Sequence, residues 1–175
     1  MTNFFISDTH FSHENIIKYE NRPFKDTTEM NETMIQNWNN VVKPNDEIYI
    51  LGDFIFDNKE NALDIINRLN GRKYMIKGNH DSILKYKEIT DKFEWVKDYA
   101  VLKYNKTKFI LFHWPIQVWD CQHHGAIHLY GHIHSNIGDH RMEHDIPNSY
   151  NVRVDVNNFT PISIEKIIKL LEGGK

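Results

Sequence analysis

Short apolar runs recur along the chain, and several of them stop at a residue that can bind a metal or move a proton. Five such runs cover residues 3–7, 47–51, 73–76, 108–112 and 126–130, and each is followed closely by an Asp, Asn or His. Apolar runs of this length, bounded by Gly or polar residues, predict buried β-strands. Because ligands bind outside the carboxyl ends of the strands in an open α/β sheet, we expect these side chains to converge.

Helical periodicity separates the first three runs. Asp26 and Glu29 have the spacing of a capping box, and Asn58 is a second predicted helix cap. Apolar residues follow each cap at helical intervals, namely Met30, Met34, Ile35 and Trp38, then Ala62, Leu63, Ile66 and Leu69. Ser12 is predicted to cap a short helix before them, and residues 82–86 form another. The alternation of strands and helices predicts a parallel sheet covered by helices.

The second half of the chain changes character. Residues 95–104 and 107–112 predict two strands of a β-hairpin that turns at Asn105-Lys106. An aromatic and His-bearing connection follows at 114–125, and a polar loop is predicted at 135–148. Residues 150–156 alternate as a strand would, and a final helix carries one apolar face, formed by Ile164, Ile167, Ile168 and Leu171.

The side chains at the strand ends form a chemically consistent set. Seven of them are carboxylates, imidazoles or an amide: Asp8, His10, Asp53, Asn79, His113, His132 and His134. Such ligands suit Mn²⁺, Fe²⁺, Zn²⁺, Co²⁺ or Ni²⁺ and are too rich in nitrogen for Ca²⁺. Seven ligands exceed the need of one ion and predict two that share a carboxylate, an arrangement that acidifies a bound water and clamps the oxygens of a phosphoryl group. His80, next to Asn79, is the candidate proton donor to the leaving oxygen.

Each of these motifs is weak evidence when it stands alone. An Asp after a strand often forms an Asx-turn, as at Asp8, and Asn79 could be an ordinary turn residue. An isolated His113 would more often be a structural histidine at a strand end. The metal-site interpretation therefore depends on five separate strands ending in the same way.

Composition narrows the class of protein. A chain of 175 residues with 40% hydrophobic residues has the size and composition of one globular domain, which we expect to span residues 1–175. The net charge of −3 gives no support for an extended nucleic-acid track, although bound cations would still admit a small anionic substrate. One cysteine, Cys121, excludes an internal disulfide, and neither a signal peptide nor a membrane-spanning run is evident. We expect a soluble cytoplasmic domain.

Taken in order, the motifs resemble those of the calcineurin-like metallophosphoesterase superfamily. They are Asp8-Thr9-His10, Gly52-Asp53, Gly78-Asn79-His80-Asp81, His113 and Gly131-His132-Ile133-His134. Stretches such as SDTHFSHENII and LNGRKYMIKGNHD are similar to a small bacterial and phage-type subgroup. The resemblance implies that Asp8, His10 and His134 hold one ion, that Asn79, His113 and His132 hold the other, and that Asp53 bridges them. It also implies an α/β fold, a four-layer αββα sandwich of two mixed β-sheets flanked by helices.

Two departures from the family pattern affect the expected chemistry. Many relatives carry an Asp or His three residues after the bridging carboxylate, where it orients the catalytic histidine. Here that position is Phe56, and Asp57 comes one residue late, so the group that orients His80 is open. The segment GDFIFDN also lacks the Asp-Arg-Gly of protein Ser/Thr phosphatases, which argues against a phosphoprotein substrate.

Further residues are candidates for substrate contact. His13 and Arg22 lie on loops after the first strand and could touch phosphate, although a surface histidine and a solvated arginine are alternatives. Asp81 is a third candidate because it follows His80. Trp119 and His123 lie between two ligand-bearing strands and could line the rim of a pocket.

These observations favour a metal-dependent phosphodiesterase that hydrolyses a small phosphorylated or nucleotide substrate. It would use two divalent metal ions, and Mn²⁺ is the ion that we expect first. A phosphomonoesterase and a nuclease for short nucleic acids are alternatives of the same class. Long duplex nucleic acid is not expected, since a basic track is missing. From a different class comes a metal-poor interaction scaffold on the same fold, which would have eroded ligands, and none is eroded here. Natural substrate, metal and oligomeric state stay open.

Overall fold

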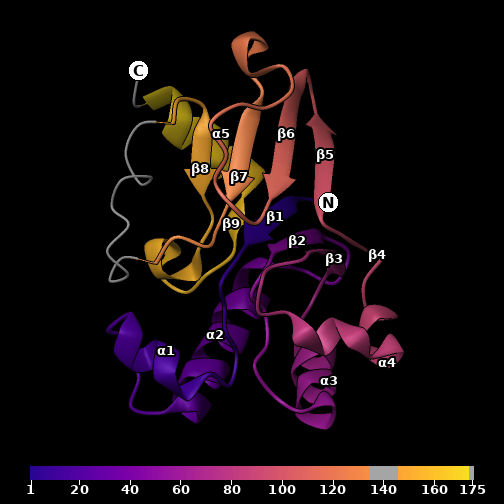
Figure 1. The fold of residues 1–175 in the computed structure, drawn as a ribbon, viewed down its shortest axis with the longest axis vertical. Helices are drawn as coiled ribbons and strands as arrows, with labels where there is room; N and C mark the ends of the chain where they lie inside the picture. Colours follow the sequence, from indigo (N-terminus) through magenta and orange to yellow (C-terminus); the bar gives the residue numbers. More distant parts are fainter. Residues whose placement is uncertain (135–145, 174–175) are drawn as a thin grey trace.

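The computed structural model describes residues 1–134 and 146–173 and contains two packed β-sheets (Figure 1). The first has the order β4-β3-β2-β1-β9, formed by Trp95–Lys97, Arg72–Ile76, Glu47–Leu51, Asn3–Ile6 and Ile162–Ser163. The second has the order β5-β6-β7-β8, formed by Tyr99–Tyr104, Thr107–Phe112, Ile127–Tyr130 and Ser149–Asn151. Strands β1 to β4 are parallel and β9 is antiparallel to β1, whereas β5 is antiparallel to β6 and β6, β7 and β8 are parallel. The predicted class, two mixed sheets with flanking helices, is confirmed.

Helices cover the first sheet on the side away from the second. They are α1 (Glu14–Tyr19), α2 (Thr27–Val41), α3 (Lys59–Arg68) and α4 (Lys87–Thr90), grouped in the lower half of Figure 1. The two strongest predicted caps are confirmed: Asp26 Oδ1 accepts from Glu29 N at 2.8 Å, and Asn58 Oδ1 accepts from Asn61 N at 2.9 Å. The sequence therefore specifies where α2 and α3 begin.

Alternation along the strands divides the core into layers. In β1, Phe4 and Ile6 pack with the helices, whereas Phe5 faces the second sheet and stacks near Phe109 of β6, with ring centroids 6.5 Å apart. Helix α5 (Ile164–Gly173) contributes Ile164 and Ile167 to this inter-sheet cluster, as its predicted apolar face requires. The outer face of the second sheet is covered by the connection 114–125.

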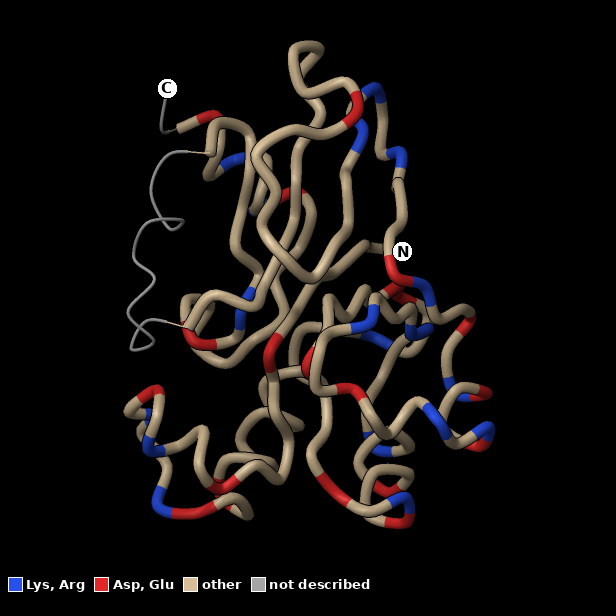
Figure 2. The backbone as a smooth tube through the Cα atoms, in the orientation of Figure 1, with Lys and Arg blue, Asp and Glu red and all other residues tan. Residues whose placement is uncertain are grey.

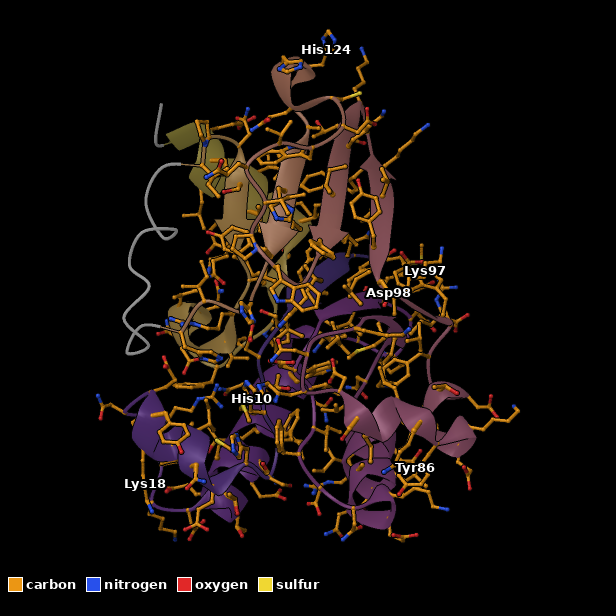
Figure 3. All side chains as sticks on the ribbon, in the orientation of Figure 1. His10, Lys18, Tyr86, Lys97, Asp98 and His124 are labelled. Atoms are coloured by element: carbon orange, nitrogen blue, oxygen red, sulfur yellow. The ribbon has the colours of Figure 1, made fainter. Side chains whose placement is uncertain are left out.

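The strand predicted at 95–104 is confirmed except at Asp98, where the chain changes sheets and the run divides into two strands. Strand β4 ends at Lys97 and β5 begins at Tyr99, with Asp98 between them (Figure 3). Trp95 packs against Tyr74 in the first sheet, with ring centroids 5.3 Å apart, whereas Ala100 lies in the inter-sheet cluster. In a continuous run of strand-forming residues, the sequence does not indicate which sheet each part joins.

Two other boundaries also differ from the prediction. Ser12 does not cap α1, since His13 holds the N-cap position; instead Ser12 N donates to Asn31 Oδ1 at 2.9 Å. The predicted strand 150–156 stops at Asn151, and residues Val154–Asn157 form a 3-10 helix (η4). Asn157 Nδ2 donates to Arg153 O at 2.9 Å and stabilises that turn. Of the predicted loop 135–148, residues 135–145 lie outside the described part of the chain.

Within the described residues, no helix combines the length and the apolar character that crossing a membrane would require.

Candidate metal centre

The carboxyl ends of five strands from both sheets meet at one place. Strands β1, β2 and β3 deliver the loops that carry Asp8, Asp53 and Asn79, and β6 and β7 deliver His113 and the His132–His134 segment. In Figure 1, β6 and β7 point towards the first sheet, and Figure 3 labels His10 below their ends. The two packed sheets therefore bring together side chains that are up to 126 positions apart in sequence.

Two groups of side chains have the spacing of metal ligands. One is formed by Asp8, His10 and His134, and the other by Asp53, His113 and His132. In each group one ligand atom from every residue lies within 4.8 Å of the others. Asn79 adds its Oδ1 to the second group, 3.1 Å from His113 Nε2.

Asp53 lies between the two groups. Its Oδ2 is 3.5 Å from His113 Nε2 in one group and 3.8 Å from His10 Nε2 in the other. Both ring nitrogens of His10 are buried and have no hydrogen-bond partner among the described residues. Since buried polar atoms are normally paired, the orphaned His10 ring fits a site built for a cation. The residues present therefore suit two metal ions with a shared carboxylate.

The orientation of the His113 ring is fixed by the backbone carbonyl of Leu51. His113 Nδ1 lies 2.7 Å from Leu51 O, which fixes a proton on that nitrogen and leaves Nε2 facing His132 Nδ1 at 3.2 Å. Burial disfavours protonation of His113, but the Asp53 and Asp8 carboxylates outweigh burial and raise its pKa to about 9. A cation at Nε2 would take the place of the second proton that those carboxylates attract.

The imidazoles of His10, His132 and His134 are held neutral, which is the form that binds metals. Burial lowers the pKa of His10 to about 2 and that of His134 to about 4, and it also lowers the pKa of His132. Burial alone would raise the pKa of Asp53, but hydrogen bonds from His113 and the backbone N–H of His80 outweigh it and lower the pKa to about 2. Burial raises the pKa of Asp8 to about 6.

The backbone around the ligands is bent into a conformation that non-glycine residues seldom adopt. Asp8, His10, Asp53 and His132 all have positive φ, between 48° and 69°. Such strain collects at functional sites, where the surrounding structure maintains it. A Cβ on Gly78 would overlap the Asp53 carboxylate and one on Gly131 would overlap the Asp8 carboxylate. The glycines of two motifs thus make room for the two carboxylates.

His80 stands in an aromatic group instead of beside a carboxylate. Its ring centroid is 5.2 Å from that of Phe56, and the Phe56 ring stacks on His13 at 4.3 Å with an interplanar angle of 13°. The backbone N–H of His80 donates to Asp53 Oδ1 at 2.9 Å. The structure therefore brings His13 and His80 to the candidate site, with Phe56 as the neighbour of both.

Arg22 lies behind the site and not on its surface. Its guanidinium is buried and donates to Asp8 O and Thr9 O, each at 2.8 Å, and it forms two hydrogen bonds with the Asp155 carboxylate. A side chain engaged in this way has no free face for substrate phosphate. Arg22 instead holds the strained loop that carries Asp8 and His10.

Asp81 is also occupied by the protein itself. Its carboxylate is buried and accepts backbone N–H groups from Gly78 at 2.7 Å, Phe54 at 2.8 Å and Asp53 at 2.9 Å. Burial raises the pKa of Asp81, and these hydrogen bonds oppose the rise. The predicted substrate contact is replaced by a clamp between the loops after β2 and β3.

Trp119 and His123 do not lie at the site. Trp119 is buried on the outer face of the second sheet, where its Nε1 donates to Ala126 O at 3.0 Å. His123 is exposed beside His124, which Figure 3 labels at the end of the molecule opposite His10. The connection 114–125 runs away from the carboxyl ends of the strands because it must return to the start of β7.

Two residues near the site escaped the sequence reasoning. Trp114 is half-buried beside His113 and His132, with ring centroids 4.9 Å and 5.8 Å away. Glu20 Oε1 lies 3.6 Å from His134 Nδ1, the nitrogen opposite the one that faces Asp8. Trp114 could have been predicted to lie near the site, because it directly follows the candidate ligand His113. Glu20 belongs to no motif, so nothing in the sequence indicates that it lies there.

The comparisons with known proteins agree with this geometry. A model of the calcineurin-like phosphoesterase superfamily domain matches residues 1–146. An uncharacterized protein of Methanocaldococcus jannaschii is 42% identical over 178 residues, which is 98% of this chain and 92% of that protein. The gene 66 protein of Mycobacterium phage L5 is 35% identical over 80 residues, 44% of this chain and 38% of that one. A crystal structure of a protein of unknown function from Aquifex aeolicus superposes with a TM-score of 0.73 at 31% identity, covering 97% of this chain and 98% of that chain. The chain therefore belongs to the calcineurin-like phosphoesterase superfamily.

Proposed function

We propose that the protein is a dinuclear-metal phosphodiesterase that hydrolyses a small phosphorylated or nucleotide substrate, with Mn²⁺ as the preferred ion. The observation that carries the proposal is the position of Asp53, whose Oδ2 is within 4 Å of a histidine from each ligand group. A carboxylate between two sets of nitrogen ligands fits a pair of ions better than a single one.

The ligand sets follow from the two groups. Asp8, His10 and His134 would hold one ion, Asn79, His113 and His132 would hold the other, and Asp53 would reach both. Two such ions would acidify a bound water and neutralise charge on the phosphate oxygens.

His80 is the group that we assign to proton transfer. It is exposed at the site, and its backbone is tied to Asp53, so its ring stays next to the ligands without belonging to either group. It would give its proton to the leaving oxygen as the bond between phosphorus and that oxygen breaks, a contribution worth typically 10²–10⁴-fold in rate. The contact with Phe56 restricts the ring in place of the usual carboxylate or imidazole partner.

The charge distribution supports a small substrate. Lys and Arg are interspersed with Asp and Glu along the described chain and do not gather in a stripe (Figure 2). Neutralising many phosphates of a long nucleic acid requires such a stripe.

The decisive experiment measures metal content and activity together. Elemental analysis of the purified protein is followed by hydrolysis of bis-p-nitrophenyl phosphate with Mn²⁺, for the wild type, Asp53→Ala, His80→Ala and the control His124→Ala. We expect about two ions per chain in the wild type. His80→Ala should keep the metals and lose about 10²–10⁴-fold in kcat on a dialkyl diester, whose alkoxide needs a proton to leave, and less on the p-nitrophenyl ester, because p-nitrophenolate leaves readily without one.

The variants separate the ways in which the proposal can fail. Asp53→Ala should lose both metal and activity, whereas His124→Ala should match the wild type because its imidazole lies far from His10 (Figure 3). A wild type that binds the metals and hydrolyses p-nitrophenyl phosphate but no diester would favour a phosphomonoesterase. A wild type without metal and without activity on either ester would refute the proposal.

A further inference from the structure

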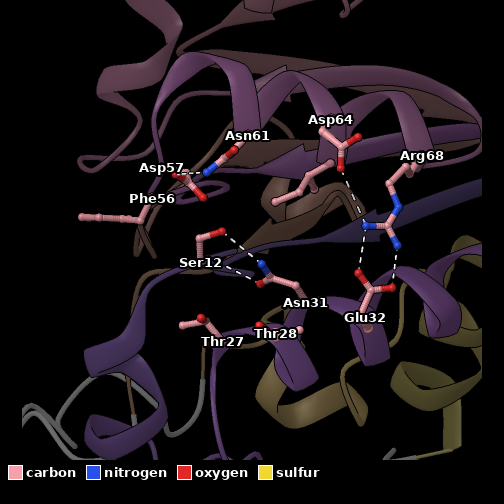
Figure 4. A pocket seen from close by; sticks show the side chains of 11 residues that line it. Ser12, Thr27, Thr28, Asn31, Glu32, Phe56, Asp57, Asn61, Asp64 and Arg68 are labelled. Carbon is pink, nitrogen blue, oxygen red and sulfur yellow. Dashed lines mark hydrogen bonds and ion pairs between the residues drawn. The ribbon is translucent and has the colours of Figure 1, made fainter.

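A polar cavity lies between α2 and α3 beside the candidate metal centre. It has a volume of about 420 Å³ and is lined by both helices and by the loops that carry Ser12 and Phe56 (Figure 4). This volume lies within the range that binds small organic molecules. No residue of either ligand group lines it.

Phe56 connects this cavity to the proton donor. Phe56 is one of the lining residues, and its ring is 5.2 Å from the His80 ring and stacks on His13. Since His80 is assigned to protonate the leaving oxygen, the rest of the leaving group has to lie on the His80 side of the phosphate. The cavity is next to that side, because Phe56 lines it and also contacts His80.

The polar groups in the cavity can bind hydroxyls. The hydroxyls of Thr27 and Thr28 line it, together with Ser12 Oγ, which accepts from Asn31 Nδ2 at 3.0 Å. A hydroxyl has both a donor and an acceptor, so these groups can bond in either direction to an alcohol. The apolar part of the lining includes Phe56 and Ile65.

The charges in the cavity disfavour further phosphate. Arg68 is the sole cation of the described lining residues, and it is already engaged: its Nη1 is 2.8 Å from Glu32 Oε1 and 3.8 Å from Asp64 Oδ2. Figure 4 shows this group at the end of the cavity opposite Phe56. Asp57 adds a third carboxylate, whose Oδ1 accepts from Asn61 Nδ2 at 3.0 Å. An anion placed there would meet uncompensated negative charge.

We propose that this cavity binds the leaving group of the substrate and selects a hydroxyl-bearing alcohol that is uncharged or cationic over one that carries further phosphate or a carboxylate. The inference rests on the proposed phosphodiesterase activity. In the reaction a water oxygen forms the new bond to phosphorus, the bond to the alcohol oxygen breaks, and the proton from His80 goes to that oxygen.

The test uses three methyl aryl phosphodiesters with Mn²⁺ and the full-length protein. Their phenol leaving groups carry a trimethylammonium, a hydroxymethyl or a carboxylate substituent at the meta position, and each enzymatic rate is divided by the alkaline hydrolysis rate of the same ester. We expect a normalised kcat/KM for the carboxylate ester that is about tenfold or more below that for the trimethylammonium ester, as like and opposite charges at a partly desolvated site predict.

Two variants assign this preference to the cavity. Asp57→Asn keeps an oxygen for the hydrogen bond from Asn61, and it should reduce the ratio of kcat/KM for the trimethylammonium ester to that for the carboxylate ester about three- to tenfold. Asp98→Asn makes the same change in net charge at an exposed position paired with Lys77, and should leave the ratio unchanged. Asn61→Trp fills the cavity from the exposed face of α3 and should raise KM for the hydroxymethyl ester about tenfold while the metal content stays the same.

The outcomes distinguish this inference from the proposed function. Equal normalised kcat/KM values for the three esters would overturn the inference. So would a ratio of trimethylammonium to carboxylate ester that Asp57→Asn changes no more than Asp98→Asn does. In both cases the proposed phosphodiesterase activity would stand. An enzyme that binds no metal and cleaves none of the esters would overturn both.

Discussion

Replacing Asp81 by Asn tests whether the loops after β2 and β3 are held together by one carboxylate. In the wild type, Oδ2 accepts the N–H groups of Asp53 and Gly78 and Oδ1 accepts that of Phe54. An amide can offer its one oxygen to the first pair, but its NH₂ then faces the N–H of Phe54, and a buried donor loses its partner.

The expected loss of stability follows from these three bonds. A hydrogen bond to a charged group contributes about 1.5–3 kcal/mol, and a neutral one contributes about 0.5–1.5 kcal/mol. One charged bond lost and two weakened amount to about 3.5–6 kcal/mol in the free energy of unfolding. For a chain of this size, each kcal/mol shifts Tm by about 2–4 °C, so Tm should fall by roughly 7–24 °C.

Thermal unfolding measures this effect, with Asp98→Asn as the control. Asp98 forms an exposed pair with Lys77 at 3.3 Å, and such pairs contribute about 0–1 kcal/mol. Metal content should fall in the Asp81 variant as well, since the clamp positions the Asp53 loop. A Tm for Asp81→Asn within about 2 °C of the control would refute the assignment of Asp81 as a clamp.

Three further substitutions follow from the same structure. Arg22→Met should lower the free energy of unfolding by about 3–5 kcal/mol, because the buried carbonyls of Asp8 and Thr9 lose their donor and Asp155 loses two charged hydrogen bonds, and chemical denaturation would measure the loss. Gly78→Ala should abolish metal binding, since its Cβ would collide with the Asp53 carboxylate, whereas Gly173→Ala meets open space and should bind metal normally, as elemental analysis would reveal. Trp119→Ala should cost about 3–5 kcal/mol of stability and leave the kcat/KM of the folded enzyme within about twofold of the wild type, because Trp119 packs on the outer face of the second sheet.

The sequence was sufficient to identify the candidate ligands that the structure brings together, because each follows a strand. Strand ends such as those before Asp8 and His113 are local signals, and the carboxyl edge of a sheet gathers whatever they carry. The caps of α2 and α3 were equally local. These features could be read in windows of a few residues.

Other features depend on contacts between distant parts of the chain. From its neighbours in sequence Arg22 looks like a surface loop residue, but its contacts with Asp155 and with the carbonyls of Asp8 and Thr9 bury it. His123 lies close to His113 in sequence, but it is beside His124, which Figure 3 labels far from His10 of the candidate site. The division between β4 and β5 at Asp98 could not be predicted from the sequence either, because strand propensity does not indicate which sheet a strand joins.

The bond between Arg22 and Asp155 has a consequence for the order in which the protein folds. The two residues are 133 positions apart, and His132 and Asp8, which also bond, are 124 apart. Closing loops of this length is slow and entropically costly, so local helices form before these contacts do. A partly synthesised chain that ends near residue 146, where the family match stops, would lack Asp155 and would leave the Asp8 loop unsupported. The proposed metal binding would therefore come late in folding, and chelation of the ions should speed unfolding of the native protein.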